Sequence, residues 1–435
     1  MSSDTCRTSP VALRLARVSL AVAWLFVMAA AASADTIGLH RGISMTRVLD
    51  WAQIKPGTTR EFAFPPFPER SSTLTLDTLP ALRRTGFDFV RLPVDPGPFL
   101  QLQGPHRDDL DRTLIDRVNL ILSAGFSVII DFHPSGANPD YTARALTIGA
   151  DTPIFQAYLR LLGRTAGLLD TLHSRKVSLE LMNEPPVRAQ TWQPMLEAAY
   201  AAARRRSTGL MLILDGADEA SAEAMMAVDP RAFAKDPAAV FTFHYYAPYQ
   251  FTHQGAPWNA ARYLTDVPYP ARARPLTESL KSTAAAIART ALSQSEKSLA
   301  YDDAQQRLTS YWRSEFDRNA IARTFDQVAA WARRNELPPD RVLLGEFGAR
   351  RADQPADNDR VAERARWFRD VREEAEARDF PWAAWTYRDS GGFGLVDNET
   401  SNEIDREIAA ALGLSPGSHA ERSPGDQPAT GRAKP

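Results

Sequence analysis

The sequence has almost no cysteine. Its single cysteine, Cys6, stands in a chain of 435 residues, so no disulfide framework can form within the chain. Cys6 also lies in an N-terminal segment that we expect to be removed, which would leave the mature protein without a thiol. The fold must then be stabilised by its packed core, and catalysis by a cysteine nucleophile is excluded.

An excess of charge of one sign is also missing. The chain has 51 Lys and Arg residues against 53 Asp and Glu residues. Proteins that bind nucleic acids or anionic membrane surfaces usually carry an excess of positive charge. We therefore expect no nucleic-acid partner, and a substrate that is neutral or weakly charged.

Several catalytic motifs are absent as well. The chain has no glycine-rich phosphate loop, no nucleophilic serine motif and no His-x-His spacing, which excludes the common signatures of nucleotide-binding enzymes, serine hydrolases and many metallohydrolases. His133 and His244 thus lack the companions that a hydrolytic metal site usually has. We expect neither a metal nor another cofactor.

The longest apolar run, residues 18–32, lies near the N-terminus. Its ~15 residues are fewer than the ~20 that a membrane-spanning helix needs. Basic residues precede the run and small residues follow it: Arg7, Arg14 and Arg17, then Ala32-Ser33-Ala34. This order predicts a signal peptide over residues 1–34 and a secreted or periplasmic protein without membrane contact after cleavage. A transmembrane anchor is the alternative.

The rest of the chain alternates between short apolar runs and helical patterns. The runs lie near residues 37, 87, 127, 177, 210, 240, 342 and 382. Alternation of this kind predicts a parallel sheet, and eight units predict closure into an α/β fold, the (β/α)8 TIM barrel, over residues 35–412. Residues 413–435 are mostly Pro, Gly, Ser and charged, so we expect a disordered tail.

The alternation is interrupted after the sixth strand. Before the helix predicted near residue 319, residues 250–275 are rich in aromatic residues and proline, and residues 276–311 are polar and helix-forming. We interpret this stretch as a long insertion in the barrel rather than as a second domain. Because the loops after barrel strands carry function, the insertion is expected at the substrate end.

Two glutamates follow apolar runs in similar settings. Glu184 has Asn183 before it and two prolines behind it, and Glu346 stands between glycines in residues 342–348. One such glutamate is more commonly a solvated loop charge, but the repeated setting argues against this reading. Because the carboxyl ends of barrel strands hold catalytic groups, we predict that both glutamates are catalytic.

Further polar and aromatic residues stand at the ends of the predicted strands. In a closed barrel they converge on one pocket around the two glutamates. Side-chain alternation also puts Glu180 on the same face as Glu184, so Glu180 is expected to support the site from below. The candidate binding residues are Arg91, His133, Asn183, His244, Tyr246 and Trp385. For Arg91, a structural ion pair is the alternative.

A pair of carboxyl groups in one pocket is what cleavage of a glycosidic bond needs. One group must be protonated to donate to the leaving oxygen, and the other must be ionised to attack or stabilise the anomeric carbon. Arg91 would keep the pKa of the second group low. Asn183 could hydrogen-bond a sugar hydroxyl, and Tyr246 could orient the nucleophile. Trp385 offers a flat apolar face on which a pyranose ring could pack.

Six short motifs occur together in this chain, and their combination resembles glycoside hydrolase family 5, the cellulase family. The resemblance covers roughly residues 37–412, and residues 251–258 look like a stretch found in bacterial members. The motifs are Arg-Leu-Pro (91–93), Asp-Phe-His (131–133), Leu-Met-Asn-Glu-Pro (181–185), His-Tyr-Tyr (244–246), Gly-Glu-Phe-Gly (345–348) and Trp385.

The resemblance implies a secreted retaining glycoside hydrolase in which Glu184 is the acid/base and Glu346 the nucleophile. It also implies that the other strand-end residues line the −1 subsite. The expected partner is a β-linked polysaccharide or oligosaccharide such as a β-glucan, bound by a monomer. Trp258 and Tyr249 are candidates for outer subsites, although Trp258 and His253 also fit residues that pack the insertion.

Two alternatives use the same residues. One is a carbohydrate-binding barrel with weak catalysis that serves in exopolysaccharide handling. The other is a transglycosylase, which differs from a hydrolase only in how well water is excluded from the glycosyl-enzyme.

Overall fold

The computed structural model describes residues 38–68, 74–75, 77–351, 358–389, 391–396 and 402–415. The predicted signal peptide and residues 416–435 of the predicted tail lie outside the described residues, so both remain predictions. All described helices and strands belong to the unit that begins at Leu39.

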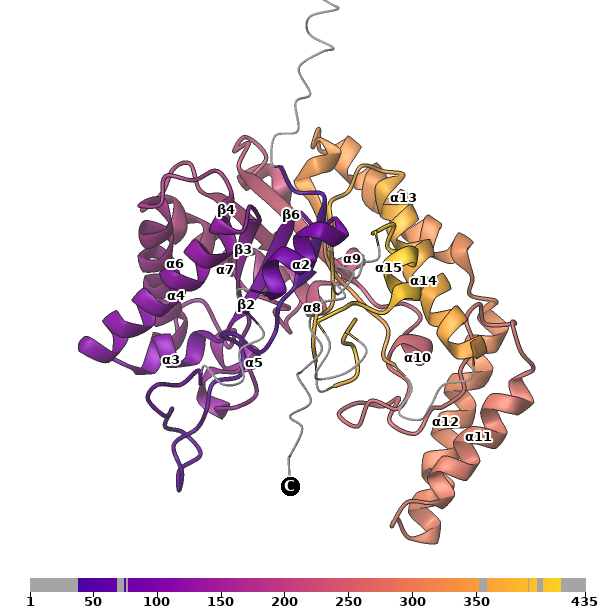
Figure 1. Cartoon of the computed structure of the whole chain (residues 1–435). Coiled ribbons are helices and arrows are strands. Elements are labelled where there is room, and N and C mark those ends of the chain that lie inside the picture. The colour runs from indigo at the N-terminus through magenta and orange to yellow at the C-terminus, as the bar shows by residue number, and fades with distance from the viewer. Residues whose placement is uncertain are drawn as a thin grey trace, which may run out of the picture. The chain divides into compact units, whose positions relative to one another are not determined.

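Eight parallel strands form a closed barrel in this unit (Figure 1). Each strand pairs with its neighbour along the chain, and β8 pairs with β1 to close the ring. The strands are buried on both faces, which explains why they appear in the sequence as continuous apolar runs. The predicted barrel is confirmed, with strands β1 (Arg41–Ser44), β2 (Phe89–Val94), β3 (Ser127–Phe132), β4 (Val177–Glu180), β5 (Met211–Asp215), β6 (Ala239–Tyr245), β7 (Val342–Phe347) and β8 (Trp382–Ala384).

Helices occupy the connections between the strands. Helix α6 buries the apolar stripe expected from the sequence, including Phe155, Tyr158 and Leu162. Among the described residues, no helix combines the length and the apolar character needed to cross a membrane. The helices outside the β6–β7 connection are α2 (Thr78–Thr85), α3 (Pro96–Gln101), α4 (Pro105–Ser123), η2 (Pro139–Tyr141), α5 (Ala143–Leu146), α6 (Pro153–Asp170), α7 (Ala189–Arg204), α8 (Ala217–Ala220), α9 (Ala222–Met226), η3 (Pro230–Ala232), α14 (Asn358–Glu376) and α15 (Arg406–Ala411).

Strand β4 is shorter than expected. It ends at Glu180, so Asn183 and Glu184 lie beyond the strand and not on its last residues. Glu184 has a left-handed backbone with φ of 46°, a conformation that costs a non-glycine residue ~1–2 kcal/mol and ends the extended chain. The regular alternation of side chains along a strand therefore does not reach Glu184.

Residues 217–226 do not form one continuous helix. Asp218, Glu219 and Ala220 all have positive φ values, of 43°, 58° and 55°, and they separate the short α9 from β5. The backbone N–H of Asp218 donates to the carbonyl of Val187 (3.0 Å). This left-handed turn is thereby held against the segment that follows Glu184.

The connection between β6 and β7 is long and mostly helical. Helices α11 and α12 lie side by side (Figure 1). Helix α12 begins with a capping box, in which Ser293 and Glu296 satisfy each other's backbone N–H groups. The connection contains α10 (Tyr249–Thr252), α11 (Leu276–Ala288), α12 (Gln294–Ser314), α13 (Arg318–Arg334) and η4 (Pro339–Arg341).

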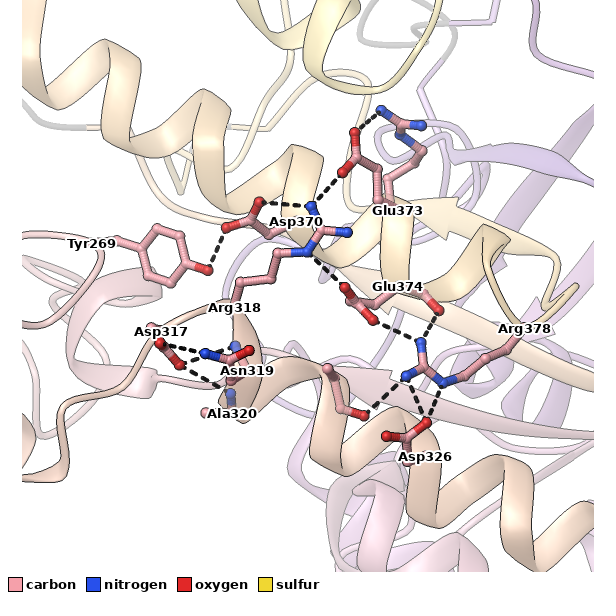
Figure 2. Close-up of polar contacts among 12 residues, drawn as sticks. Tyr269, Asp317, Arg318, Asn319, Ala320, Asp326, Asp370, Glu373, Glu374 and Arg378 are labelled. Atoms are coloured by element: carbon pink, nitrogen blue, oxygen red, sulfur yellow. Dashed lines mark hydrogen bonds and ion pairs between the residues drawn. The ribbon is translucent and has the colours of Figure 1, made fainter.

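Helix α14 holds this connection through polar contacts (Figure 2). The Tyr269 hydroxyl donates to Asp370 (2.7 Å), and Arg318 donates to Glu373 (2.6 Å) and Glu374 (2.7 Å). Asp370 and Glu374 are 8% and 7% exposed. Because buried carboxylates need donors, these contacts tie residues on both sides of α11 and α12 to the barrel.

We predict that Tyr269→Phe lowers the free energy of unfolding by ~1–3 kcal/mol, because a buried Asp370 oxygen loses its donor. Urea denaturation of the variant measures this loss. Tyr263→Phe is the matched control, since the Tyr263 hydroxyl makes no hydrogen bond within the described residues and its removal should leave stability nearly unchanged. Equal stability of the Tyr269→Phe variant and the unmutated protein would contradict the prediction.

Candidate active site

Arg91 stands at the centre of the strand-end residues. Its side chain is fully buried, and it donates to Glu346 (2.5 Å), to both oxygens of Glu180 (2.6 and 2.8 Å) and to Asn183 (2.8 Å). Its Nη2 atom also lies 3.0 Å from Asp131. Burial alone lowers the pKa of Arg91, but the three carboxylates outweigh it and hold that pKa well above its usual value. The guanidinium is therefore a fixed positive charge.

Glu346 receives a donor on each of its carboxylate oxygens. Arg91 binds Oε1, and the Tyr246 hydroxyl donates to Oε2 (2.7 Å). Burial, followed by the charge of Glu346, raises the pKa of Tyr246 well above its usual value, so the phenol keeps the proton that it donates. The two contacts hold the Glu346 carboxylate in one orientation.

Glycines on either side of Glu346 allow neighbouring groups to approach closely. A Cβ atom on Gly345 would lie 2.4 Å from the Thr242 hydroxyl, and one on Gly348 would lie 2.5 Å from the carbonyl oxygen of Trp385. Any other residue at these two positions would displace the Thr242 side chain or the backbone at Trp385.

Glu184 is only partly enclosed. Its side chain is 32% exposed, yet protein surrounds most of it, and this burial raises the pKa of its carboxyl to about 7 although His133 and Arg91 oppose the shift. The group thus keeps its proton to near-neutral pH and remains open to a ligand. Those are the properties that a general acid requires.

His244 connects the two glutamates. Its Nδ1 atom lies 2.8 Å from Glu184 and 3.6 Å from Glu346. Burial lowers the pKa of His244, so the imidazole is neutral near pH 7. Its other nitrogen, Nε2, is buried and has no hydrogen-bond partner among the described residues.

Three further predicted residues, His133, Trp385 and Asn183, are in contact with one another or close together beside the pair. His133 stacks on Trp385, with 5.4 Å between ring centroids and 12° between ring planes, and its Nδ1 atom is 2.9 Å from Asp131. Burial lowers the pKa of His133, but Asp131 outweighs it and raises that pKa to about 9. Asn183 Nδ2 lies 3.4 Å from His133 Nε2. All eight predicted site residues are therefore brought together.

Other residues around the site were not foreseen as functional. Asp131 and Asp215, each fully buried, lie beneath the site, and Glu219 is exposed on the left-handed turn beside Glu184. Asp131 was visible in the sequence only as part of a motif. Asp215 closes the apolar run near residue 210 and so carried the same strand-end signal as the predicted residues, but it was not among the candidates. Glu219 carries no local signal, because its place depends on contacts with the segment that follows Glu184.

Aromatic side chains continue outward from Tyr246. Its ring contacts His253 and Phe393, with centroids 5.2 and 6.0 Å away, and Phe393 contacts Trp258 at 6.4 Å. Trp258 is 57% exposed and Tyr249 is 45% exposed. His253 thus packs within the connection, whereas Trp258 and Tyr249 keep apolar surface free.

Three sets of side chains have the donor types and spacing of a metal site: Asp131, His133 and Glu346; Glu180, Asp215 and His244; and Glu184, His244 and Glu346. Each set includes a carboxylate that already binds Arg91. A cation at any of them would have to compete with the buried guanidinium.

The sequence is similar to those of known proteins. The profile of the family described as "Cellulase (glycosyl hydrolase family 5)" matches residues 61–391. Endoglucanase 3 of Fibrobacter succinogenes is 23% identical over 400 residues, which is 86% of this chain and 53% of that protein. The chain thus spans about half of the length of this relative.

Solved structures share the fold. Cel5A of Thermotoga maritima in complex with cellobiose matches 87% of this chain and 98% of its own, with a TM-score of 0.60 and 21% identity. The clostridial cellulose synthase subunit Z (CcsZ) of Clostridioides difficile matches 86% of this chain and 99% of its own, with a TM-score of 0.59 and 22% identity.

The raised pKa of Glu184 predicts a pH-dependent stability. The folded protein holds this proton more tightly than the unfolded chain, so stability falls as pH rises from the ordinary value of 4.5 to about 7. Glu184→Gln should therefore raise the melting temperature more at pH 8 than at pH 4. Every other titratable group is present in both proteins, so the difference between their melting temperatures reports on Glu184 alone. An equal rise in melting temperature at the two pH values would contradict the prediction.

Proposed function

We propose that this chain, which belongs to the cellulase family (glycosyl hydrolase family 5), is a retaining glycoside hydrolase that cleaves β-glycosidic bonds within a β-glucan. Its relative is an endoglucanase, and a similar structure holds cellobiose. Both facts support a β-linked glucan as the substrate.

The closeness of the two glutamates carries the proposal. A carboxylate oxygen of Glu184, one of Glu346 and a ring nitrogen of His244 all lie within 4.8 Å of one another. Retaining enzymes place their carboxyl groups ~5–5.5 Å apart, whereas inverting enzymes need ~6.5–9.5 Å to admit a water molecule. The spacing therefore supports double displacement.

The two glutamates suit different steps. Glu346, ionised between Arg91 and Tyr246, attacks the anomeric carbon while Glu184 gives its proton to the leaving oxygen, and the glycosidic bond breaks. Glu184, now ionised, removes a proton from water, which attacks the same carbon and releases Glu346. The raised pKa of Glu184 fits the first step, and its ionised form fits the second.

The surrounding residues suit sugar binding. We assign Arg91, His133, Asn183, His244, Tyr246 and Trp385 to the −1 subsite. Trp385 offers a ring face for a pyranose, and the exposed rings of Trp258 and Tyr249 offer the same outside it. We also propose that residues 250–318 are an insertion that influences substrate choice, and that the protein is a secreted or periplasmic monomer.

We predict that Glu346→Gln lowers kcat by ~10⁴–10⁶-fold, the scale seen when a catalytic nucleophile or its base is removed. Release of reducing sugar from a soluble β-glucan measures this loss, and a melting curve verifies the fold. Glu363→Gln is the matched control, because Glu363 is also buried and paired with an arginine but lies outside the site. Substantial residual hydrolysis in the Glu346→Gln variant would overturn the assignment.

The similarity to a cellulose synthase subunit favours a second candidate, a protein that takes part in exopolysaccharide handling. Such a protein would either bind glucan and cleave it weakly, or transfer it to another sugar. A panel of β-1,4-glucan, β-1,3-glucan and mannan separates the candidates. We expect cleavage of a β-glucan into oligosaccharides. Binding without reducing sugar would favour the binding protein, and longer products at high acceptor concentration would favour transfer.

A further inference from the structure

Beneath the two glutamates lies a buried side chain that the mechanism above does not use. Asp215 is the last residue of β5 and is fully buried. Neither of its carboxyl oxygens has a hydrogen-bond partner among the described residues. An oxygen of Asp215, an oxygen of Glu180 and a ring nitrogen of His244 lie within 4.8 Å of one another.

The charges around Asp215 disfavour its ionised form. Arg91 already serves three carboxylates, those of Asp131, Glu180 and Glu346. A fourth negative charge in this space would have no counter-ion of its own. Burial, and then the charge of Glu180, raises the pKa of Asp215 well above its usual value. Both factors favour the neutral form of Asp215, which carries one O–H donor.

Two acceptors lie near this donor. One is Glu180, which contributes to the raised pKa of Asp215 but whose two oxygens already accept from Arg91. The other is His244 Nε2, which is buried without a partner in the described part of the chain. The Nδ1 atom of His244 faces Glu184 at 2.8 Å. In a neutral imidazole one nitrogen carries the hydrogen and the other accepts.

We propose that Asp215 is a positioning residue of the active site: its carboxyl O–H turns toward Nε2 of His244, so that these two groups, each without a partner within the described ranges, satisfy each other and the imidazole hydrogen stays on Nδ1, facing Glu184 and Glu346. This role rests on the proposed function, in which Glu184 changes charge during each turnover.

The consequence concerns the second step of the reaction. With the hydrogen on Nδ1, His244 donates to the ionised Glu184 that forms when the proton has left, and it stabilises that charge without becoming charged itself. With the hydrogen on Nε2, the Nδ1 lone pair would face two carboxylates. Asp215 therefore determines which of the two tautomers of His244 faces Glu184, although Asp215 does not contact Glu184, Glu346 or the sugar.

The tautomer of His244 tests the proposal directly. Nitrogen-15 NMR of histidine-labelled protein shows which ring nitrogen carries the hydrogen, and the His244 signals are assigned by their loss in a His244→Asn variant. We expect the hydrogen on Nδ1 in the unmutated enzyme and in Asp215→Asn, whose amide also donates. We expect a changed tautomer in Asp215→Ala, which has no donor.

Kinetics give a second readout. Asp215→Ala should lower kcat by ~10-fold or more, since general acid catalysis contributes ~10²–10⁴-fold, with an unchanged KM and a shifted basic limb of the pH profile. Asp215→Asn should retain kcat and the pH profile. Thr165→Val is the matched control, because Thr165 is also fully buried but lies in helix α6, outside the site, and is expected to leave both readouts unchanged.

Three results would overturn the proposal: a hydrogen on Nε2 in the unmutated enzyme, an Asp215→Asn variant as impaired as Asp215→Ala, or an Asp215→Ala variant with normal kinetics and tautomer. The groups whose charges reach Asp215 are Arg91, Asp131, Glu180 and His244, and all remain in every Asp215 variant. The NMR measurement identifies the tautomer of His244 in the absence of substrate. Failure of this proposal can therefore be distinguished from failure of the proposed glucan hydrolysis.

Discussion

The site depends on one buried positive charge. Arg91 has no exposed surface and contacts three carboxylates and Asn183. A guanidinium in this position costs several kcal/mol of desolvation unless its donors are all occupied. Because its nitrogens lie against β3, β4 and β7 at once, the same contacts that satisfy it also fix the ends of three strands. The position of the Glu346 carboxylate is therefore fixed by the need to pair the buried Arg91 guanidinium.

That one cation also divides the carboxyl groups of the site into two sets. Glu346, Glu180 and Asp131 each lie within 3.0 Å of its nitrogens. Glu184 and Asp215 receive no donor from it, and burial raises the pKa of each. Carboxyl groups a few ångströms apart thus differ in their surroundings because only some of them reach the guanidinium.

Most of the barrel and of the site was predictable from the sequence because both depend on local patterns. Apolar runs closed by a proline or a charge marked the strands, and a parallel barrel brings all strand ends to one edge. This reasoning placed Glu184 and Glu346 together. It failed where backbone conformation is set by distant contacts: β4 stops at Glu180, and residues 218–220 turn left-handed against Val187. Asp215 closes an apolar run like the other strand-end residues, but its proximity to Glu180 and His244 could not be predicted because those neighbours come from other strands.

The β6–β7 connection links substrate binding to the nucleophile. Tyr246 donates to Glu346 through its hydroxyl, and its ring packs on Phe393, which in turn contacts Trp258. Trp258 belongs to the connection that helix α14 holds through Tyr269 and Arg318. In the proposed function, a sugar bound on Trp258 would therefore contact the group of rings that includes Tyr246. Since an orientation error of a fraction of an ångström at a reacting atom lowers the rate, firm attachment of this connection to the barrel serves catalysis as well as stability.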